Sequence, residues 1–234
     1  FLSGHYAIIK PSAKDDTLIR HLVAKMIEWN SAAEPYLQFQ PLLKGCDAYI
    51  ATGGNNTGRY FEYYFQNYPS IIRRNRTSVA VLTGEESREE LENLSDDIHL
   101  YFGLGCRNVT QSYVPKDYDL IPLLASFDKY SDFINHHKYK NNYDYNLAMH
   151  ILNNRYYMTN GSTLLVEEAS PFSPISQVHF QYYDNVKDVQ QNLQKMEALQ
   201  CIVGNGYTPF GQAQNPQLSD FADGVDTMQF LNNL

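Results

Sequence analysis

Three cysteines are the side chains in this chain that best suit nucleophilic chemistry, and their surroundings differ. Cys106 lies in the segment YFGLGCRNVT, with Gly103 and Gly105 close before it. Small residues beside a thiol leave room for a carbonyl group to approach, and a loop position keeps the sulfur reachable. Cys46 and Cys201 lie at the starts of apolar strands, where cysteine usually packs as a small hydrophobe. Cys106 is therefore the candidate nucleophile, and a buried packing role is its alternative.

The cysteine count and the overall charge exclude several classes of function. Three widely separated cysteines match neither a zinc site nor a disulfide framework, so we expect reduced thiols, no metal and a cytoplasmic location. The formal net charge of -8 argues against nucleic-acid binding, which depends on Lys and Arg side chains that displace counterions. Apolar runs are too short to span a bilayer, which takes roughly 18 residues.

A glycine-rich turn is a second candidate for chemistry. The segment Thr52-Gly53-Gly54-Asn55-Asn56-Thr57-Gly58 follows a predicted strand and precedes an aromatic helical run. A turn that opens a helix leaves backbone N–H groups unpaired, and such groups suit a phosphate. The alternative is a plain tight turn.

The elements that position these residues alternate between strands and helices, which predicts an α/β fold with a parallel sheet. A helix capped near Asp15-Asp16-Thr17 has Leu18, Ile19, Leu22 and Met26 as its expected packed face. The pattern predicts a dinucleotide-binding domain over residues 1–82, a thiol domain over 83–199, and a return of 200–234 to the first domain. Strands are expected at 5–10, 36–40, 46–52, 77–82, 110–114, 163–167, 176–182 and 201–203, and helices at 117–129, 141–154, 185–199 and from about 216.

Four segments, in this order, resemble the aldehyde dehydrogenase superfamily, and more closely its fatty acyl-CoA reductase branch of the bioluminescence type. They are HYAIIKPSAK at 5–14, ATGGNNTGRY at 51–60, the Cys106 segment, and PFGQAQ at 209–214. The resemblance covers nearly the whole chain. It implies an aldehyde dehydrogenase-like α/β fold with a parallel dinucleotide-binding sheet and an αβ catalytic domain. It also implies a preceding amino-terminal part, which would supply an oxyanion-stabilising asparagine.

The same resemblance assigns roles to individual residues. Lys10 and Ser12 match the family's Lys-Pro-Ser turn, whose lysine contacts the cofactor's adenosine ribose. Thr52, Gly53 and Gly54 match the turn that supports the cofactor pyrophosphate. Cys106 falls at the position of the catalytic thiol, and its own backbone N–H is then one oxyanion donor.

Two departures from the family pattern carry information. The general-base glutamate of aldehyde-oxidising members corresponds to a position at or beside Arg73, so no carboxylate is available there to activate water. The glutamate that holds the ribose hydroxyls is replaced by Ala13, followed by Lys14, which favours a 2'-phosphate and hence NADPH.

We therefore expect an acyl-CoA reductase that forms an aldehyde from a fatty acyl-CoA through a thioacyl intermediate on Cys106. An NAD(P)-dependent aldehyde dehydrogenase and a cysteine acyltransferase or hydrolase are the alternatives within enzymes. A nonenzymatic nucleotide-binding or structural protein is the alternative outside them. Arg73, Arg76 and His137 are candidate substrate contacts, with a solvated surface as the alternative for the arginines. As a partner we expect another copy of this chain or an acyl-transferring enzyme.

Overall fold

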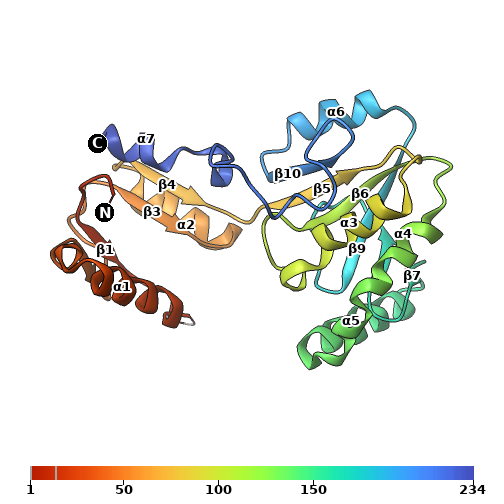
Figure 1. The fold of residues 1–234 in the computed structure, drawn as a ribbon, viewed down its shortest axis with the longest axis horizontal. Coiled ribbons are helices and arrows are strands. Elements are labelled where there is room, and N and C mark those ends of the chain that lie inside the picture. Colours follow the sequence, from red (N-terminus) through yellow and green to blue (C-terminus); the bar gives the residue numbers. More distant parts are fainter. Residues whose placement is uncertain (1, 14) are drawn as a thin grey trace. The chain divides into compact units, whose positions relative to one another are not determined.

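The computed structural model describes residues 2–13 and 15–234, and the chain divides into two compact units (Figure 1). The first unit comprises residues 1–74 and 225–234. The second unit comprises residues 75–224. Each unit is described separately below.

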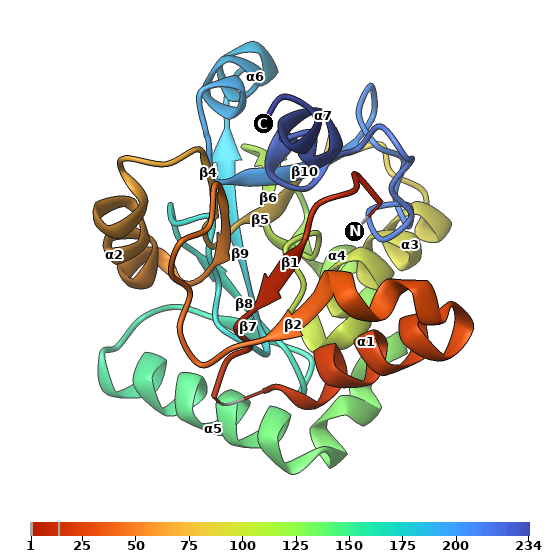
Figure 2. The ribbon, with the colours of Figure 1, turned by 90° about the vertical axis from the view of Figure 1, so that its left-hand side faces the viewer.

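Two pairs of parallel strands make up the sheet structure of the first unit (Figure 2). β1 (Ala7–Ile9) pairs with β2 (Leu37–Phe39), and β3 (Tyr49–Thr52) pairs with β4 (Ser70–Arg73). Parallel pairing requires a crossover connection, and helices provide it in both cases. These are α1 (Thr17–Trp29), followed by the 3-10 turn η1 (Ser31–Tyr36), and α2 (Asn55–Phe65); α7 (Thr227–Asn232) completes the unit.

The face that the sequence predicted for the first helix is packed only in part, because Ile19 and Met26 are half-buried beside Val23. Val23 is its buried residue, whereas Leu18 and Leu22 are 64% and 48% exposed. The predicted cap is also wrong in detail, because the Asp16 carboxylate makes no capping bond and pairs instead with Arg20 Nε at 2.6 Å.

A six-stranded sheet with the order β10-β5-β6-β9-β8-β7 forms the second unit. Its strands pair in parallel except for the short edge strand β7, which is antiparallel to β8. The expected strands of this region all form, and β7 is an addition that the sequence did not predict. Their bounds are β5 Thr77–Val81, β6 Val109–Pro115, β7 Met158–Thr159, β8 Leu164–Glu167, β9 Gln177–Tyr183 and β10 Leu199–Gly204.

Helices cover both faces of this sheet, because successive residues of a strand point to opposite faces. Ala80 of β5 packs in a core with α3 (Arg88–His99) and α4 (Leu120–Ser126). Val79 and Val81 pack in a second core with α6 (Val186–Gln194). The 3-10 segments η2 (Leu100–Gly103), η3 (Phe127–Asn135) and η4 (Ala222–Gly224) and the helix α5 (His137–Leu152) complete the unit.

The division between the units differs from the boundary that we expected near residue 83. β5 belongs to the second unit because it pairs with β6 on one side and β10 on the other. The return of the chain to the first unit begins at residue 225 and not at 200. The last helix is also shorter than expected: it starts after Asp226, whose carboxylate accepts a hydrogen bond from Gln229 N, since Asp223 and Gly224 before it have positive φ.

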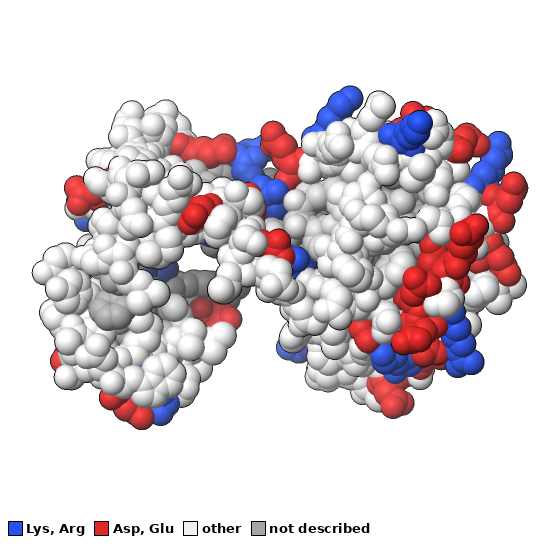
Figure 3. Space-filling view, turned by 45° about the horizontal axis from the view of Figure 1, so that its top comes forward, with Lys and Arg blue, Asp and Glu red and all other residues white. Residues whose placement is uncertain are grey.

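Surface charge follows the acidic composition. Acidic side chains gather on one side of the second unit, and the face shown in Figure 3 carries no comparable basic area. None of the helices in the described ranges is both long and apolar enough to cross a membrane.

Candidate functional site: the Cys106 turn

The structure places Cys106 at the surface, in the turn between η2 and β6. Asn108 N–H donates to Gly105 O at 3.0 Å, which closes the turn around the thiol. The Cys106 carbonyl accepts a hydrogen bond from Ser78 Oγ at 3.1 Å. The backbone N–H of Cys106 makes no hydrogen bond to any described residue, so it is a donor left for a ligand.

A buried asparagine that sequence reasoning missed fixes this turn. The Asn108 side chain is fully buried, and its Oδ1 accepts from Gly105 N at 2.8 Å. Its Nδ2 donates to the carbonyls of Asp97, Ile98 and Leu100 at 2.9, 3.2 and 2.9 Å. The last carbonyls of a helix lack partners within it, so Asn108 both ends α3 and holds the thiol turn against it.

The backbone directly before the turn is strained. Tyr101 and Phe102 have φ values of 57° and 59°, and Gly103 continues the left-handed run at 71°. Left-handed conformations cost about 1–2 kcal/mol for each residue other than glycine, so surrounding contacts must hold this segment in place. Phe102 packs against Phe133 with ring centroids 4.5 Å apart.

The segment 209–214 lies against the other side of the turn. Arg107 Nε donates to the carbonyl of Ala213. The Asp97 carboxylate accepts from Gly211 N at 2.7 Å and from Ala213 N at 2.9 Å. Burial raises the pKa of Asp97 to about 6, although these two backbone donors favour the ionised form. The PFGQAQ segment of the resemblance is therefore in contact with the Cys106 segment.

The other two thiols are less available than Cys106. Cys201 is 6% exposed, and its Sγ lies 3.4 Å from Thr208 Oγ1. Burial raises the pKa of the Cys201 thiol, which lowers its reactivity. Cys46 is half-buried. Cys106 alone of the three is exposed, as a nucleophile requires.

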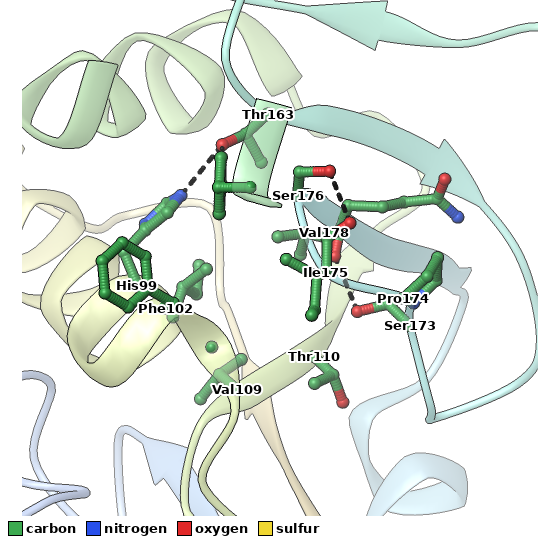
Figure 4. Close-up of a pocket in the computed structure, with 14 residues that line it drawn as sticks. His99, Phe102, Val109, Thr110, Thr163, Ser173, Pro174, Ile175, Ser176 and Val178 are labelled. Carbon is green, nitrogen blue, oxygen red and sulfur yellow. Dashed lines mark hydrogen bonds between the residues drawn. The ribbon is translucent and has the colours of Figure 1, made fainter. Parts of the chain in front are cut away.

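A small cavity lies beside the strained segment (Figure 4). His99 forms part of its wall, with Nδ1 2.9 Å from Ser95 O and Nε2 3.1 Å from Thr163 Oγ1. Burial lowers the pKa of His99 to about 4, so the ring is neutral and donates through Nδ1 while Nε2 accepts. The cavity has a volume of about 20 Å³, which admits one water and not an acyl chain.

The adjacent histidines His136 and His137 differ in their relation to the turn. The His136 ring packs against Phe102 at 5.0 Å. His137, the candidate substrate contact, is exposed at the first position of α5 and stacks on His136. His137 is connected to the thiol turn indirectly, through His136, which packs on Phe102.

The arginine cluster is divided between the two units. Arg73 ends β4, where its Nη2 donates to Thr227 Oγ1 at 2.9 Å. Arg76 lies in the second unit, where it pairs with Asp223 at 2.9 Å and donates to the carbonyls of Glu197 and Leu199. Both candidate substrate contacts thus have protein partners and are not simply solvated.

The proposed cofactor residues all lie in the first unit. Lys10 directly follows β1 and is exposed, and Ser12 forms an isolated bridge with Asp15. Lys14 lies outside the described residues. Two carboxylates, Asp15 and Asp16, follow it in the sequence.

The glycine turn connects β3 to the start of α2. Thr52 ends β3, and Gly54 caps α2 without any side-chain hydrogen bond to the helix. The first turn of α2 also contains no acidic residue. Its first N–H groups therefore suit an anion, and glycine is favoured at position 53 because a Cβ there would lie only 3.0 Å from Thr57 Cβ.

The described residues contain no cluster of three or more His, Cys, Asp or Glu side chains arranged to hold a metal ion. The uncapped start of α2 is the feature of the first unit that suits an anionic group.

Comparison with solved structures bears on the fold. No protein-family profile matches the chain, and no curated protein matches it in sequence. An indole-3-acetaldehyde dehydrogenase complexed with NAD+ superposes with a TM-score of 0.60 at 10% identity, covering 84% of this chain and 49% of the other. A putative methylmalonate-semialdehyde dehydrogenase from Sinorhizobium meliloti, complexed with NAD, gives 0.60 at 12%, covering 88% and 52%.

A 1-pyrroline-5-carboxylate dehydrogenase from Thermus thermophilus gives a TM-score of 0.59 at 9% identity, covering 84% of this chain and 47% of the other. The chain spans about half the length of the solved structures that it matches. The expected fold is confirmed: the chain has an α/β fold that matches aldehyde dehydrogenase structures.

Proposed function

We propose that this chain belongs to a nicotinamide-dependent oxidoreductase that acts on an aldehyde or acyl carbonyl through a covalent adduct on Cys106. The observation that carries the proposal is an exposed thiol in a turn held on both sides by partly buried hydrogen bonds, within an aldehyde dehydrogenase fold. A nucleophile held in one geometry avoids the entropic cost of finding its approach to the substrate.

The roles of the residues follow from their positions. The thiolate form of Cys106 attacks the carbonyl carbon, and negative charge develops on the carbonyl oxygen. The backbone N–H of Cys106, which bonds to none of residues 2–13 and 15–234, is the donor that this chain offers to the oxygen. A nicotinamide cofactor, when bound, supplies or accepts the hydride.

The first unit supplies the cofactor contacts in this proposal. The uncapped N-terminus of α2, behind Gly53 and Gly54, receives the pyrophosphate, and Lys10 and Ser12 at the end of β1 contact the adenosine ribose. NADPH remains our proposal on the basis of Ala13 and Lys14. NAD is the cofactor named with two of the similar structures, and NADH is therefore the alternative.

Two reaction directions fit this site. Aldehyde oxidation is the direction named by the similar structures, which are dehydrogenases of aldehydes. Fatty acyl-CoA reduction is favoured by a specific observation: the sequence holds no Asp or Glu between Glu62 and Glu85, and the position assigned to the water-activating base lies at or beside Arg73. Without that base, water hydrolyses the thioacyl group only slowly, so hydride can reduce the group to an aldehyde first.

One assay distinguishes the directions. The purified protein is given either an aldehyde with NAD+ or NADP+, or an acyl-CoA with NADH or NADPH, and the nicotinamide absorbance is followed. Aldehyde formation from acyl-CoA supports reduction, and acid formation without CoA supports oxidation. Cys106→Ala abolishes either activity, whereas Cys46→Ala leaves it unchanged. Activity that survives in Cys106→Ala, or thioester turnover without nicotinamide, refutes the proposal.

A further inference from the structure

We propose that Asn108 is a positioning residue for Cys106, and this inference rests on the proposed function of that thiol. Asn108 lies two residues beyond Cys106 and does not face the substrate side, because its side chain is fully buried. Its amide group connects the thiol turn to the end of α3.

The pattern of its hydrogen bonds is specific to a carboxamide. Oδ1 accepts from the N–H of Gly105, and Nδ2 donates to three carbonyls at the end of α3. An aspartate in this place keeps the acceptor and loses the donor, and a leucine provides neither. A buried group with both functions satisfied gives the turn one conformation.

The backbone around the thiol is fixed on both sides. Before Cys106, Gly105 is held by Asn108; at Cys106, the carbonyl is held by Ser78. After it, Arg107 donates to Ala213, whose own N–H is bound by Asp97. Because Asp97 O also accepts from Asn108, the contacts form one connected network. Cys106 is the exposed residue whose backbone this network holds.

Gly105 and the Asn108 side chain are in close contact. A Cβ at Gly105 would lie 2.9 Å from Asn108 Oδ1, closer than carbon and oxygen approach. The glycine before the thiol is therefore required by the asparagine behind it, in addition to any room it leaves for a substrate.

The test compares Asn108→Ala and Asn108→Asp with the matched control Asn146→Ala. Asn146 is also a buried asparagine of the second unit that donates to a backbone carbonyl, Ile175 O at 3.1 Å, and this bond involves no residue of the thiol turn. Three quantities are measured for each protein: the rate of acylation of Cys106 by an acyl-CoA, the rate of its alkylation by iodoacetamide, and amide hydrogen exchange in residues 103–110.

We expect Asn108→Ala to slow acylation about 100-fold, since loss of a fixed approach geometry has effects of this size. Alkylation, which depends on exposure and thiolate content more than on approach, changes by less than about threefold. Exchange in 103–110 speeds up while exchange elsewhere does not. Asn146→Ala lowers thermal stability without changing the ratio of the two rates.

Equal losses of acylation in Asn108→Ala and Asn146→Ala, or faster exchange spread over the whole second unit, would overturn the inference. An unacylated wild-type Cys106 refutes the proposed function instead. In that event the exchange and alkylation measurements decide the inference on their own, because they report on the turn without requiring a substrate.

Discussion

Replacing one buried carboxyl group, that of Asp97, should change how the free energy of unfolding depends on pH. Burial raises its pKa from the ordinary 3.8 to about 6. A carboxyl with a raised pKa stabilises the fold while protonated; this stability is full below about pH 4 and is lost as the pH rises through about 6. A shift of this size corresponds to about 3 kcal/mol.

A second buried group two residues later has the opposite effect. Burial lowers the pKa of His99 from 6.5 to about 4, so its contribution is full above pH 6.5 and is lost as the pH falls through about 4. The corresponding free energy is also about 3 kcal/mol. The two groups therefore offset each other between pH 4 and 6.5 in the wild type.

Asp97→Asn removes one of these two effects. We expect the free energy of unfolding of this variant to fall by about 2–3 kcal/mol more than that of the wild type between pH 7 and pH 4. His99→Gln should show the reverse, a gain relative to the wild type on acidification. The Asp97→Asn protein also loses about 1–3 kcal/mol at all pH values, since an amide oxygen pairs less completely with two N–H donors.

Urea denaturation at half-unit intervals from pH 4 to pH 7 measures these quantities, with equal m-values as the check on two-state behaviour. Parallel pH profiles for the wild type and Asp97→Asn would contradict the reasoning. They would mean that Asp97 titrates alike in the folded and unfolded chains.

Three further predictions concern other parts of the molecule. Gly204→Ala should cost about 2–4 kcal/mol, because φ there is 144° and the new Cβ would lie 2.4 Å from Val81 O; thermal denaturation measures this, and an unchanged Tm would contradict it. Leu94→Ala, at a fully buried position, should cost about 2–5 kcal/mol in urea denaturation, while Leu218→Ala at an exposed one should change stability by less than about 0.5. Iodoacetamide should modify Cys106 before Cys201 in the folded protein, as peptide mass spectrometry can show; faster labelling of Cys201 would contradict its burial.

Much of the architecture follows from the sequence because its signals are local. The runs around Val79, Val114 and Val166 are short, apolar and bounded by turn residues, and each forms a strand of the sheet. The acidic start near Glu89 and Glu90 leads into α3, where Ser87 and Glu90 form a capping box.

The domain boundary could not be read in this way, because it depends on which strands pair. The segment 77–82 reads equally well as the last strand of one domain or the first of the next, and only its pairing with β10, more than a hundred residues away, decides. The face of α1 presents the same difficulty, since Leu18 and Val23 are equally apolar and their partners lie elsewhere in the chain.

The residues around the thiol were also only partly predictable. Cys106 could be selected for its glycines and loop position, but Asn108 and Asp97 had no local signal that set them apart from surface polar residues. Their roles arise from burial against the end of α3 and the 209–214 segment. Asn108, which directly precedes β6, can be recognised only in retrospect, since a polar side chain at the buried start of a strand must find partners.

The central claim is tested most directly by mass spectrometry of the protein after brief exposure to a long-chain acyl-CoA without nicotinamide. We predict a mass increase equal to one acyl group, located on the peptide that contains Cys106, reversed by hydroxylamine and absent from Cys106→Ser. An unmodified Cys106, or an acyl group found on Cys46 or Cys201 in its place, would contradict the account.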